Sequence, residues 1–343
     1  MGLLFILFFF FHCDFRMTSW YVLSSALNSI QTHAKCRRDY FIAAGVIYIF
    51  SLGVAQVRTF LMHGVHEASI DLLPSGLVRV KIPTIISWQA GQHVFVRFLT
   101  LGMHSMTAHP FTICSIAYDP DQVGKASEIV FLIKPRRGIT ARLAKLASKS
   151  PGCTKKVLLD GPYGGLSETG LAQFDRILVI AGGSGGGFSL AVVEEALKHH
   201  AASAEKIQVI FATRNPTMAD WYNDEMHAKL STFNASKQAS VSVHITGEEN
   251  NLSGPDPEEP DKQPPEPRIT SEGRYNLSTH RQRPNIPEIV AAATNGQAGK
   301  RIGVLVCGPA SMLHDTRNAT ARAQLGAVNG TVEEVFLHTE PFS

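Results

Sequence analysis

The sequence lacks the features that mark several common classes of protein. Its five cysteines are spread over 343 residues without a CxxC pair, which argues against a zinc site or a disulfide framework and leaves free thiols in a reducing compartment. The net charge is only +3, which gives no reason to expect nucleic acid as a partner. What remains is a chain whose length favours about two globular domains.

The amino terminus also lacks a run that could span a bilayer alone. Residues 2–11 are apolar but too short, and no basic segment or cleavage site marks a signal peptide; a buried stub and the tail of a longer membrane helix both remain open. Residues 40–62 are long enough, with Ser51, Gln56 and Arg58 as the notably polar members. They predict a transmembrane helix, the alternative being a helix buried in the soluble part.

From residue 65 onward, short alternating runs predict an antiparallel barrel. Residues 77–82 (LVRVKI), 91–98 (GQHVFVRF) and 129–134 (IVFLIK) alternate and are separated by proline and glycine, as barrel strands are. After the barrel, two arginines, a glycine and a threonine precede a helical pattern at residues 141–148. Such a helix start favours an anion, although a solvated basic turn would look the same.

The stretch His109-Pro110-Phe111-Thr112-Ile113-Cys114-Ser115 is the predicted seat of a flavin. Pro110 fixes its own φ, removes a donor and pushes His109 toward an extended backbone. We expect Phe111 and Thr112 to point from this rigid edge at a flat ligand, because an aromatic ring can cover an isoalloxazine and a hydroxyl can bond its heteroatoms. A buried strand with a proline at its edge would have the same sequence.

A glycine cluster gives the strongest local signal of the second half. The apolar run at residues 176–181 leads into glycines at 182–187 and then a helix, where a pyrophosphate can approach the backbone. The spacing is not GxGxxG, and no acidic residue closes the next strand. That strand ends in Thr213-Arg214-Asn215, and an arginine there suits the 2′-phosphate of NADP. Glycine-rich turns also serve purely structural ends.

Strands and helices alternate from residue 171 onward, which predicts a doubly wound parallel sheet. Residues 247–268 are rich in proline and acids, so we predict a disordered insertion over about 247–282; an interaction tail is the alternative. The predicted domains are a membrane region (1–62), an antiparallel flavin barrel (63–168) and a nucleotide-binding lobe (169–343).

Eight motifs in order carry a family resemblance from about Phe41 to Phe342: GQHVF, HPFTI, GPYGG, AGGSGG, ATRN, RPNIPEI, CGP and HTEPF. The chain resembles the fungal ferric-chelate reductases, whose family includes the NADPH oxidases. The resemblance implies electron flow from NADPH to FAD and through haem to an Fe(III) chelate across the membrane, the plasma membrane, with both nucleotide lobes cytosolic. The rivals are a superoxide-generating NADPH oxidase and a non-catalytic, truncated membrane protein that binds nucleotide.

The resemblance also assigns residues to each part of the two cofactors. It implies a flavin site of His109, Pro110, Phe111, Thr112 and Ile113, with Arg137, Gly138 and Thr140 at the pyrophosphate. For the phosphates and ribose of NADPH it implies Gly161, Pro162, Tyr163, Gly164, Gly182, Gly183, Ser184, Gly185 and Gly186. Thr213 and Arg214 would meet the adenosine end, and Cys307, Gly308 and Pro309 the nicotinamide. Thr112, Cys307 and Phe342 would be catalytic, with Phe342 covering the flavin.

The amino terminus departs from the family pattern. Residues 8–20 resemble the end of a haem-carrying helix with His12 as an axial ligand, but the partner helix is not found, so we expect this chain alone not to bind two haems. Residues 21–39 insert Lys35, Arg37 and Arg38 into an expected outside loop, against the positive-inside tendency. We hypothesise a retained intron or gene-model error and an amino-terminal truncation, which transcript sequencing would test.

Overall fold

A computed structural model describes residues 34–102, 105, 107–117, 127–166, 170–199, 207–233, 239–247, 276–297 and 299–341. His12 and Phe342, both assigned roles above, lie outside these residues. The chain divides into two compact units, Met1–Met62 and His63–Ser343.

The first unit contains helix α2 (Ala34–His63). Its large apolar side chains, among them Tyr40, Ile49 and Phe50, are exposed. Among the described residues, no helix combines the length and apolar character needed to cross a membrane. This finding does not support the transmembrane helix predicted over residues 40–62.

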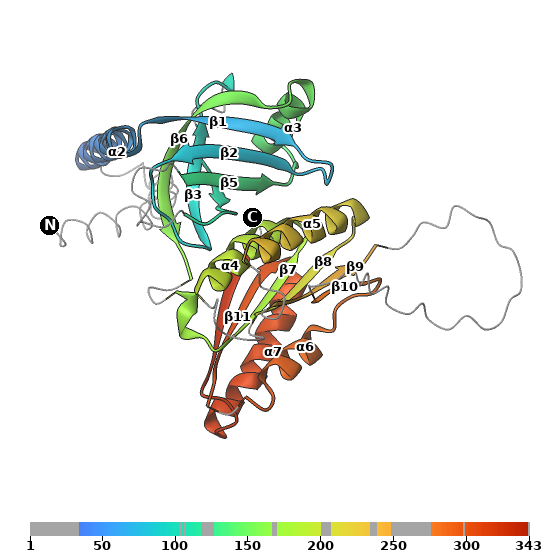
Figure 1. The fold of residues 1–343 in the computed structure, drawn as a ribbon. Helices are drawn as coiled ribbons and strands as arrows, with labels where there is room; N and C mark the ends of the chain where they lie inside the picture. Colours follow the sequence, from blue (N-terminus) through green and yellow to red (C-terminus); the bar gives the residue numbers. More distant parts are fainter. Residues whose placement is uncertain are drawn as a thin grey trace, which may run out of the picture. The chain divides into compact units, whose positions relative to one another are not determined.

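The second unit begins with an antiparallel sheet of order β4-β3-β6-β1-β2-β5 (Figure 1). Its strands are β1 (Val65–Leu72), β2 (Val78–Thr84), β3 (Gln92–Phe98), β4 (His109–Thr112), β5 (Ser127–Ile133) and β6 (Cys153–Gly164). Along β2, Val78, Val80 and Ile82 are fully buried, because alternate side chains of a strand share one face. Helix α3 (Ile139–Lys149) adds Leu143 and Ala147 to the same core.

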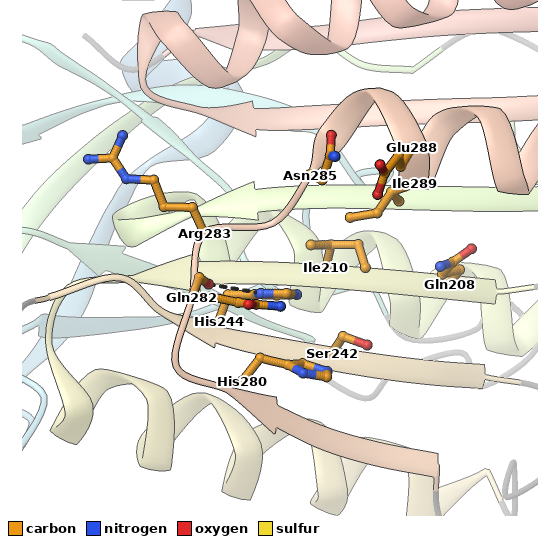
Figure 2. Close-up of a pocket in the computed structure, with 10 residues that line it drawn as sticks. All are labelled: Gln208, Ile210, Ser242, His244, His280, Gln282, Arg283, Asn285, Glu288 and Ile289. Carbon is orange, nitrogen blue, oxygen red and sulfur yellow. Dashed lines mark hydrogen bonds between the residues drawn. The ribbon is translucent and has the colours of Figure 1, made fainter. Parts of the chain in front are cut away.

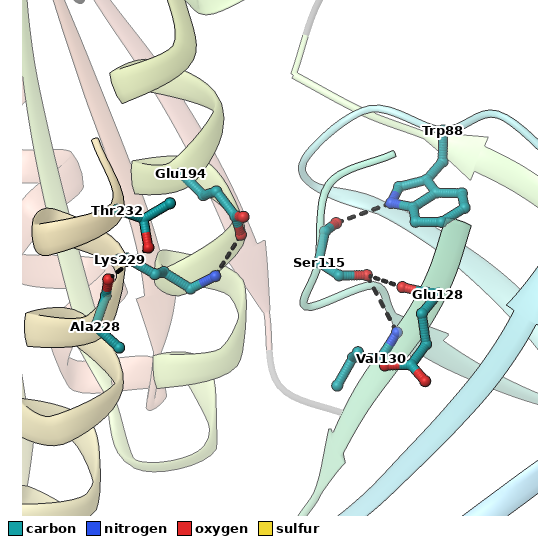
Figure 3. A network of polar contacts seen from close by, with 8 residues as sticks. All are labelled: Trp88, Ser115, Glu128, Val130, Glu194, Ala228, Lys229 and Thr232. Atoms are coloured by element: carbon teal, nitrogen blue, oxygen red, sulfur yellow. Dashed lines mark hydrogen bonds and ion pairs between the residues drawn. The ribbon is translucent and has the colours of Figure 1, made fainter. Parts of the chain in front are cut away.

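The two edges of this sheet meet just after β4. The amide of Cys114 donates to the carbonyl of Val130 at 2.8 Å, and the amide of Val130 donates to Ser115 Oγ at 3.1 Å. Ser115 Oγ donates to the carbonyl of Glu128, and Trp88 Nε1 donates to the carbonyl of Ser115 (Figure 3). These bonds join the chain after β4 to β5, so the sheet curls upon itself and the predicted antiparallel barrel is confirmed.

The remaining strands form a parallel sheet of order β10-β9-β8-β7-β11-β12. The strands are β7 (Arg176–Gly182), β8 (Ile207–Thr213), β9 (Ala239–Ile245), β10 (Asn276–His280), β11 (Arg301–Gly308) and β12 (Glu334–Pro341). Between them lie η2 (Leu171–Gln173), η3 (Gly183–Gly185), α4 (Gly186–His199), α5 (Pro216–Thr232), α6 (Ile286–Thr294) and α7 (Ala310–Val328). Helices α4 and α5 cover one face and α6 and α7 the other (Figure 1).

The burial of β7 shows why the sheet carries helices on both faces. Ile177 and Val179 belong to the core that α4 and α5 complete, whereas Leu178 and Ile180 belong to the core of α6 and α7. A strand buried on both sides reads as a continuous apolar run. The predicted doubly wound sheet is confirmed, and its strand order reverses between β7 and β11, where such folds place their ligands.

One stretch of the predicted insertion is ordered. Asn276–His280 forms β10 and pairs in parallel with β9, although the prediction placed it within the insertion of residues 247–282. The proline-rich and acidic composition ends well before it, and Leu277 packs against the core of α4 and α5. A short strand with one large apolar residue gives too weak a period to recognise. Residues 248–275 lie outside the described part of the chain.

Candidate functional site

Two turns meet at the carboxyl ends of β7 and β11. Cys307 pairs in register with Ala181, so the predicted nicotinamide residues lie beside the predicted phosphate turn. A Cβ on Gly182 would come within 2.9 Å of Pro309, and a Cβ on Gly185 would overlap the carbonyl oxygen of Cys307. These two glycines are therefore required for the packing of one turn on the other.

The other two predicted glycines of this turn, Gly186 and Gly183, have different surroundings. A Cβ on Gly186 would lie 3.0 Å from the ring of Phe211, whereas a Cβ on Gly183, whose φ is +54°, would meet nothing within 4 Å. Ser184 is half-buried. Gly183 and Ser184 thus form the open side of the turn at the start of α4, where free N–H groups attract an anion.

The predicted flavin seat lies on β4, at the edge of the barrel sheet. Phe111 is half-buried and its ring contacts Phe131, with centroids 5.8 Å apart, whereas Ile113 is fully buried. Neighbouring residues of a strand face opposite sides. Phe111 therefore packs on the barrel core, and Thr112 lies on the other side of the strand; that both point at a flat ligand stays a prediction. Pro110 is exposed, and His109 Nε2 is bonded to Thr107 Oγ1 at 2.9 Å.

A glutamate that the sequence reading did not select joins the two lobes. Thr112 Oγ1 donates to Glu340 Oε1 at 3.4 Å, and Glu340 pairs in register with Cys307. On its other side, Glu340 Oε2 lies 3.6 Å from His338 Nε2. The carboxylate therefore connects the predicted flavin strand with the predicted nicotinamide turn. Its signal was the HTEPF motif, whose Phe342 was selected instead.

The barrel also contacts α4 directly. The amide of Ala90 donates to Glu195 Oε2 at 2.6 Å, and a Cβ on Gly187 would lie 2.5 Å from the sulfur of Cys114. On α4 itself, Glu194 pairs with Lys229 of α5 (Figure 3). The helix that begins at the phosphate turn is thus fixed to both lobes.

Residues 161–164, predicted to hold NADPH, lie on barrel strand β6. His93 pairs with Tyr163 on one side and with Thr112 on the other, so these three side chains form one row across β4, β3 and β6. Tyr163 donates its hydroxyl proton to Asp160 Oδ1 at 2.7 Å. The row sets Tyr163 in the same sheet as the predicted flavin seat, whereas the glycine turn of residues 182–186 belongs to the parallel sheet.

The predicted pyrophosphate site lies at the start of α3. Gly138 is the amino-terminal capping residue with a φ of +63°, and no side chain caps the helix. Thr140 Oγ1 donates to the carbonyl of Arg137 at 3.1 Å and accepts from the amide of Arg136 at 3.0 Å. The hydroxyl thus fixes the turn, and the uncapped first-turn N–H groups leave room for an anion.

The adenosine pair differs in exposure. Thr213 is buried, and its Oγ1 accepts from the amide of Asn215 at 3.2 Å. Asn215 in turn caps α5 by accepting from the amide of Thr217 at 3.0 Å. Arg214 is exposed. Thr213 therefore shapes the turn, and Arg214 is the member of the pair that can reach a ligand.

The two thiols at the junction are uncharged at neutral pH. Burial raises the pKa of Cys114 to about 12, against a small opposing effect of the backbone hydrogen bond from Leu132. Burial also raises the pKa of Cys307, and the negative charge of Glu340 adds to the rise. Cys307 can therefore pack against a bound ring but carries no charge there.

These features define a class of protein: a flavin barrel joined to a doubly wound nucleotide lobe at its switch point, as in the ferredoxin reductase-type oxidoreductases. Residues 62–167 match the family model of an FAD-binding domain, and residues 174–321 match that of the ferric reductase NAD binding domain. The chain therefore belongs to the ferric reductase family and carries its FAD-binding and NAD-binding domains.

Curated relatives agree with this family. The chain is 26% identical over 292 residues to "Ferric reductase transmembrane component 5" of Saccharomyces cerevisiae, covering 83% of this chain and 40% of the relative. It is 28% identical over 204 residues to a probable cell surface ferric reductase of Aspergillus oryzae, covering 55% of this chain and 26% of the relative. The chain thus spans less than half the length of these relatives.

Solved structures share the fold. A flavohemoglobin from Malassezia yamatoensis with bound FAD and heme aligns with a TM-score of 0.50 and 13% identity, covering 95% of this chain and 74% of that one. A mutant ferredoxin-NADP+ reductase from Plasmodium falciparum with 2′P-AMP aligns with a TM-score of 0.50 and 10% identity, covering 81% and 95%.

The buried thiols give a first prediction. In the native chain, Cys114 and Cys307 should resist iodoacetamide at pH 8, because only the thiolate reacts and their pKa values are raised. Cys153 is half-buried and serves as the internal control that should be alkylated. Mass spectrometry of the peptides before and after denaturation measures the difference. Rapid native labelling of Cys307 would contradict the assignment.

The packed glycine turn gives a second. Gly185→Ala places a methyl group against the carbonyl of Cys307 and should lower the free energy of unfolding by about 1–3 kcal/mol. Ser184→Ala, at the open neighbouring position, should change it by less than about 0.5 kcal/mol. Urea unfolding without nucleotide measures both. Equal stability of the two variants would show that the turn does not need a glycine at 185.

Proposed function

We propose that this chain is the reductase portion of an NADPH-dependent ferric-chelate reductase. The domains that match the FAD-binding and NAD-binding family models support this function, as do the relatives named ferric reductases. The observation that carries it is the contact of Thr112 with Glu340, because it brings the FAD-binding half and the nucleotide-binding half together at a single place.

The residues at the junction fit the two nucleotides. We propose that Thr112 and the row that includes Tyr163 hold the flavin ring, with the uncapped start of α3 at its pyrophosphate. For NADPH, we propose Gly183 and Ser184 at the phosphates and Arg214 at the adenosine end. The open space around Gly183 and Gly138, where a Cβ would meet nothing within 4 Å, is compatible with close approach of phosphate groups.

This chain contributes to the reaction by positioning the two cofactors, excluding water and holding protons on its own side chains. Bound FAD would supply the chemistry that links two-electron hydride transfer from the nicotinamide to one-electron transfer onward. Thr112 Oγ1 would orient the ring edge by hydrogen bonding, and Glu340 Oε1, its acceptor, fixes the direction of that hydroxyl. Uncharged Cys307 gives the nicotinamide an apolar surface, and the direct packing of the two turns leaves little room for water beside it.

The full activity extends beyond this chain. The relatives are named as transmembrane or cell-surface reductases, and we propose that this chain acts at the plasma membrane with both lobes on the cytosolic side. Its electrons would leave toward haem and an external Fe(III) chelate. We propose residues 63–168 and 169–343 as the two working domains. A chain that binds FAD and reduces a soluble dye with NADPH supports the enzyme over a non-catalytic nucleotide-binding remnant.

The flavin seat is tested by a double substitution. His109→Ala with Thr112→Ala should weaken FAD binding by about tenfold or more, because two hydrogen-bonding side chains are lost. Flavin fluorescence during titration of the full chain measures the affinity. Lys149→Ala, at the exposed end of α3, is the control and should bind FAD as the unchanged chain does. Unaltered affinity in the double variant would place the flavin elsewhere.

The nucleotide preference is tested at Arg214. Arg214→Ala should raise the KM for NADPH by about 10- to 100-fold, the value of a charge-assisted hydrogen bond to phosphate, and leave the KM for NADH nearly unchanged. Steady-state dye reduction with each nucleotide measures the ratio. Arg322→Ala, on the exposed side of α7, should alter neither KM. Equal effects of Arg214→Ala on both nucleotides would show that the arginine does not read the 2′-phosphate.

A further inference from the structure

A polar cavity of about 500 Å³ lies on the sheet face beside α6 (Figure 2). It was not selected from the sequence. Its walls come from β8, β9, β10, the segment that follows β10, and the first turn of α6. The lining residues are Gln208, Ile210, Ser242, His244, His280, Gln282, Arg283, Asn285, Glu288 and Ile289.

The polarity of the cavity follows from the alternation of β9. Val241 and Val243 belong to the core beneath α4 and α5, so Ser242 and His244 face the opposite side. On that side, the core of α6 and α7 reaches Ile210 of β8. Beyond β8 the sheet face is lined by hydroxyl, amide and imidazole groups, which are suited to a polar ligand.

Two stacked histidines dominate this face. The rings of His244 and His280 lie 4.8 Å apart at 21°. His244 Nδ1 lies 3.1 Å from the carbonyl oxygen of Gln282, and because a carbonyl only accepts, Nδ1 carries the proton in this bond. His280 Nε2 lies 3.1 Å from Ser278 Oγ. Neutral His244 thus has an acceptor at Nε2, and protonation converts that nitrogen into a donor.

The remaining charges of the cavity cancel. Arg283 and Glu288 line it with opposite signs, and its lining from β8 consists of Gln208 and Ile210, which do not titrate. The protonation of His244 therefore decides whether the cavity is neutral or positive. His244 pairs in register with Ala212 near the end of β8, two residues before Arg214, so the predicted adenosine residue follows the strand end beside the histidine pair.

We infer that His244, stacked on His280, forms a proton-dependent specificity element, which strengthens the binding of the 2′-phosphate of NADPH, relative to NADH, when His244 is protonated. The inference rests on the proposed function and adds a regulator to it. Because the other charges of the cavity cancel, a protonated histidine makes an anion the favoured ligand class. The place of Arg214 just after β8 points to the phosphate at the adenosine end of NADPH.

The sign of the pH dependence follows from the environment of the pair. Burial lowers the pKa of His244, the nearby His280 lowers it further, and the bond to Gln282 acts in the opposite direction. The free protein therefore holds His244 neutral at pH 7. A phosphate beside the pair favours the charged form, so binding takes up a proton, and the advantage of NADPH is present at acidic pH and fades as pH rises.

The test compares the full 343-residue chain with the variant His244→Asn/His280→Asn. Asparagine keeps a donor for the carbonyl of Gln282 but does not titrate. The ratio of kcat/KM for NADPH to that for NADH should fall about three- to tenfold from pH 6 to pH 8.5 in the unchanged chain, the effect of roughly one charge near the surface. In the variant that fall should vanish. The titration of the phosphate itself is common to both proteins and cancels.

Binding provides a readout that does not need turnover. Calorimetry with 2′,5′-ADP in buffers of different ionisation enthalpy should show more proton uptake by the unchanged chain than by the variant, whereas 5′-AMP should show no difference. Unchanged NADH turnover in the variant shows that it is folded. The inference is overturned if both proteins show the same pH slope or the same proton uptake. It is also overturned if inorganic phosphate competes equally with nucleotide binding to the unchanged chain and to the variant. Loss of dye reduction with retained proton uptake would refute the proposed function alone.

Discussion

The structure depends on the absence of side chains where α4 begins. Gly182 and Gly185 let the phosphate turn lie on Cys307 and Pro309, and Gly187 lets the barrel residue Cys114 approach the same helix. Because three separate segments converge on a single turn, the nucleotide lobe is connected to the barrel at the point where the sheet changes direction. This convergence brings Thr112 into contact with Glu340. The contact forms the site that the two lobes share.

The glycines of residues 182–187 show what a sequence pattern can and cannot predict. The run at residues 182–187 predicted a strand, a turn and a helix, and those elements are present. The sequence assigned Gly182, Gly183, Gly185 and Gly186 to an approaching nucleotide, with a purely structural role as the alternative. A Cβ on Gly182, Gly185 or Gly186 would meet protein atoms, whereas a Cβ on Gly183 would meet nothing within 4 Å. Local sequence predicts a turn that needs glycine, whereas the atom that requires Gly185 belongs to Cys307 on β11, more than a hundred residues away.

The same limit explains the other differences. Periodicity predicted the barrel and the doubly wound sheet, because alternation and apolar runs are local properties. Periodicity could not identify Glu340, because only the pairing of β12 with β11 brings that residue beside Cys307. It also could not find the histidine pair, whose members lie on β9 and β10 and are joined through a segment that resembles disordered sequence. The packing of Phe111 on Phe131 also depends on the tertiary closure of the barrel, which no local pattern shows.

The central claim is that nicotinamide and flavin meet directly at the junction of Thr112, Cys307 and Glu340. Stopped-flow mixing of the FAD-loaded full chain with NADPH deuterated on either face of its C4 carbon, without oxygen, tests this claim most directly. The account predicts that flavin absorbance is lost, and that the loss is slowed by deuterium on one face and not on the other, because the site holds the nicotinamide in one orientation. Loss of absorbance at the same rate with both forms, or no loss at all, would contradict it.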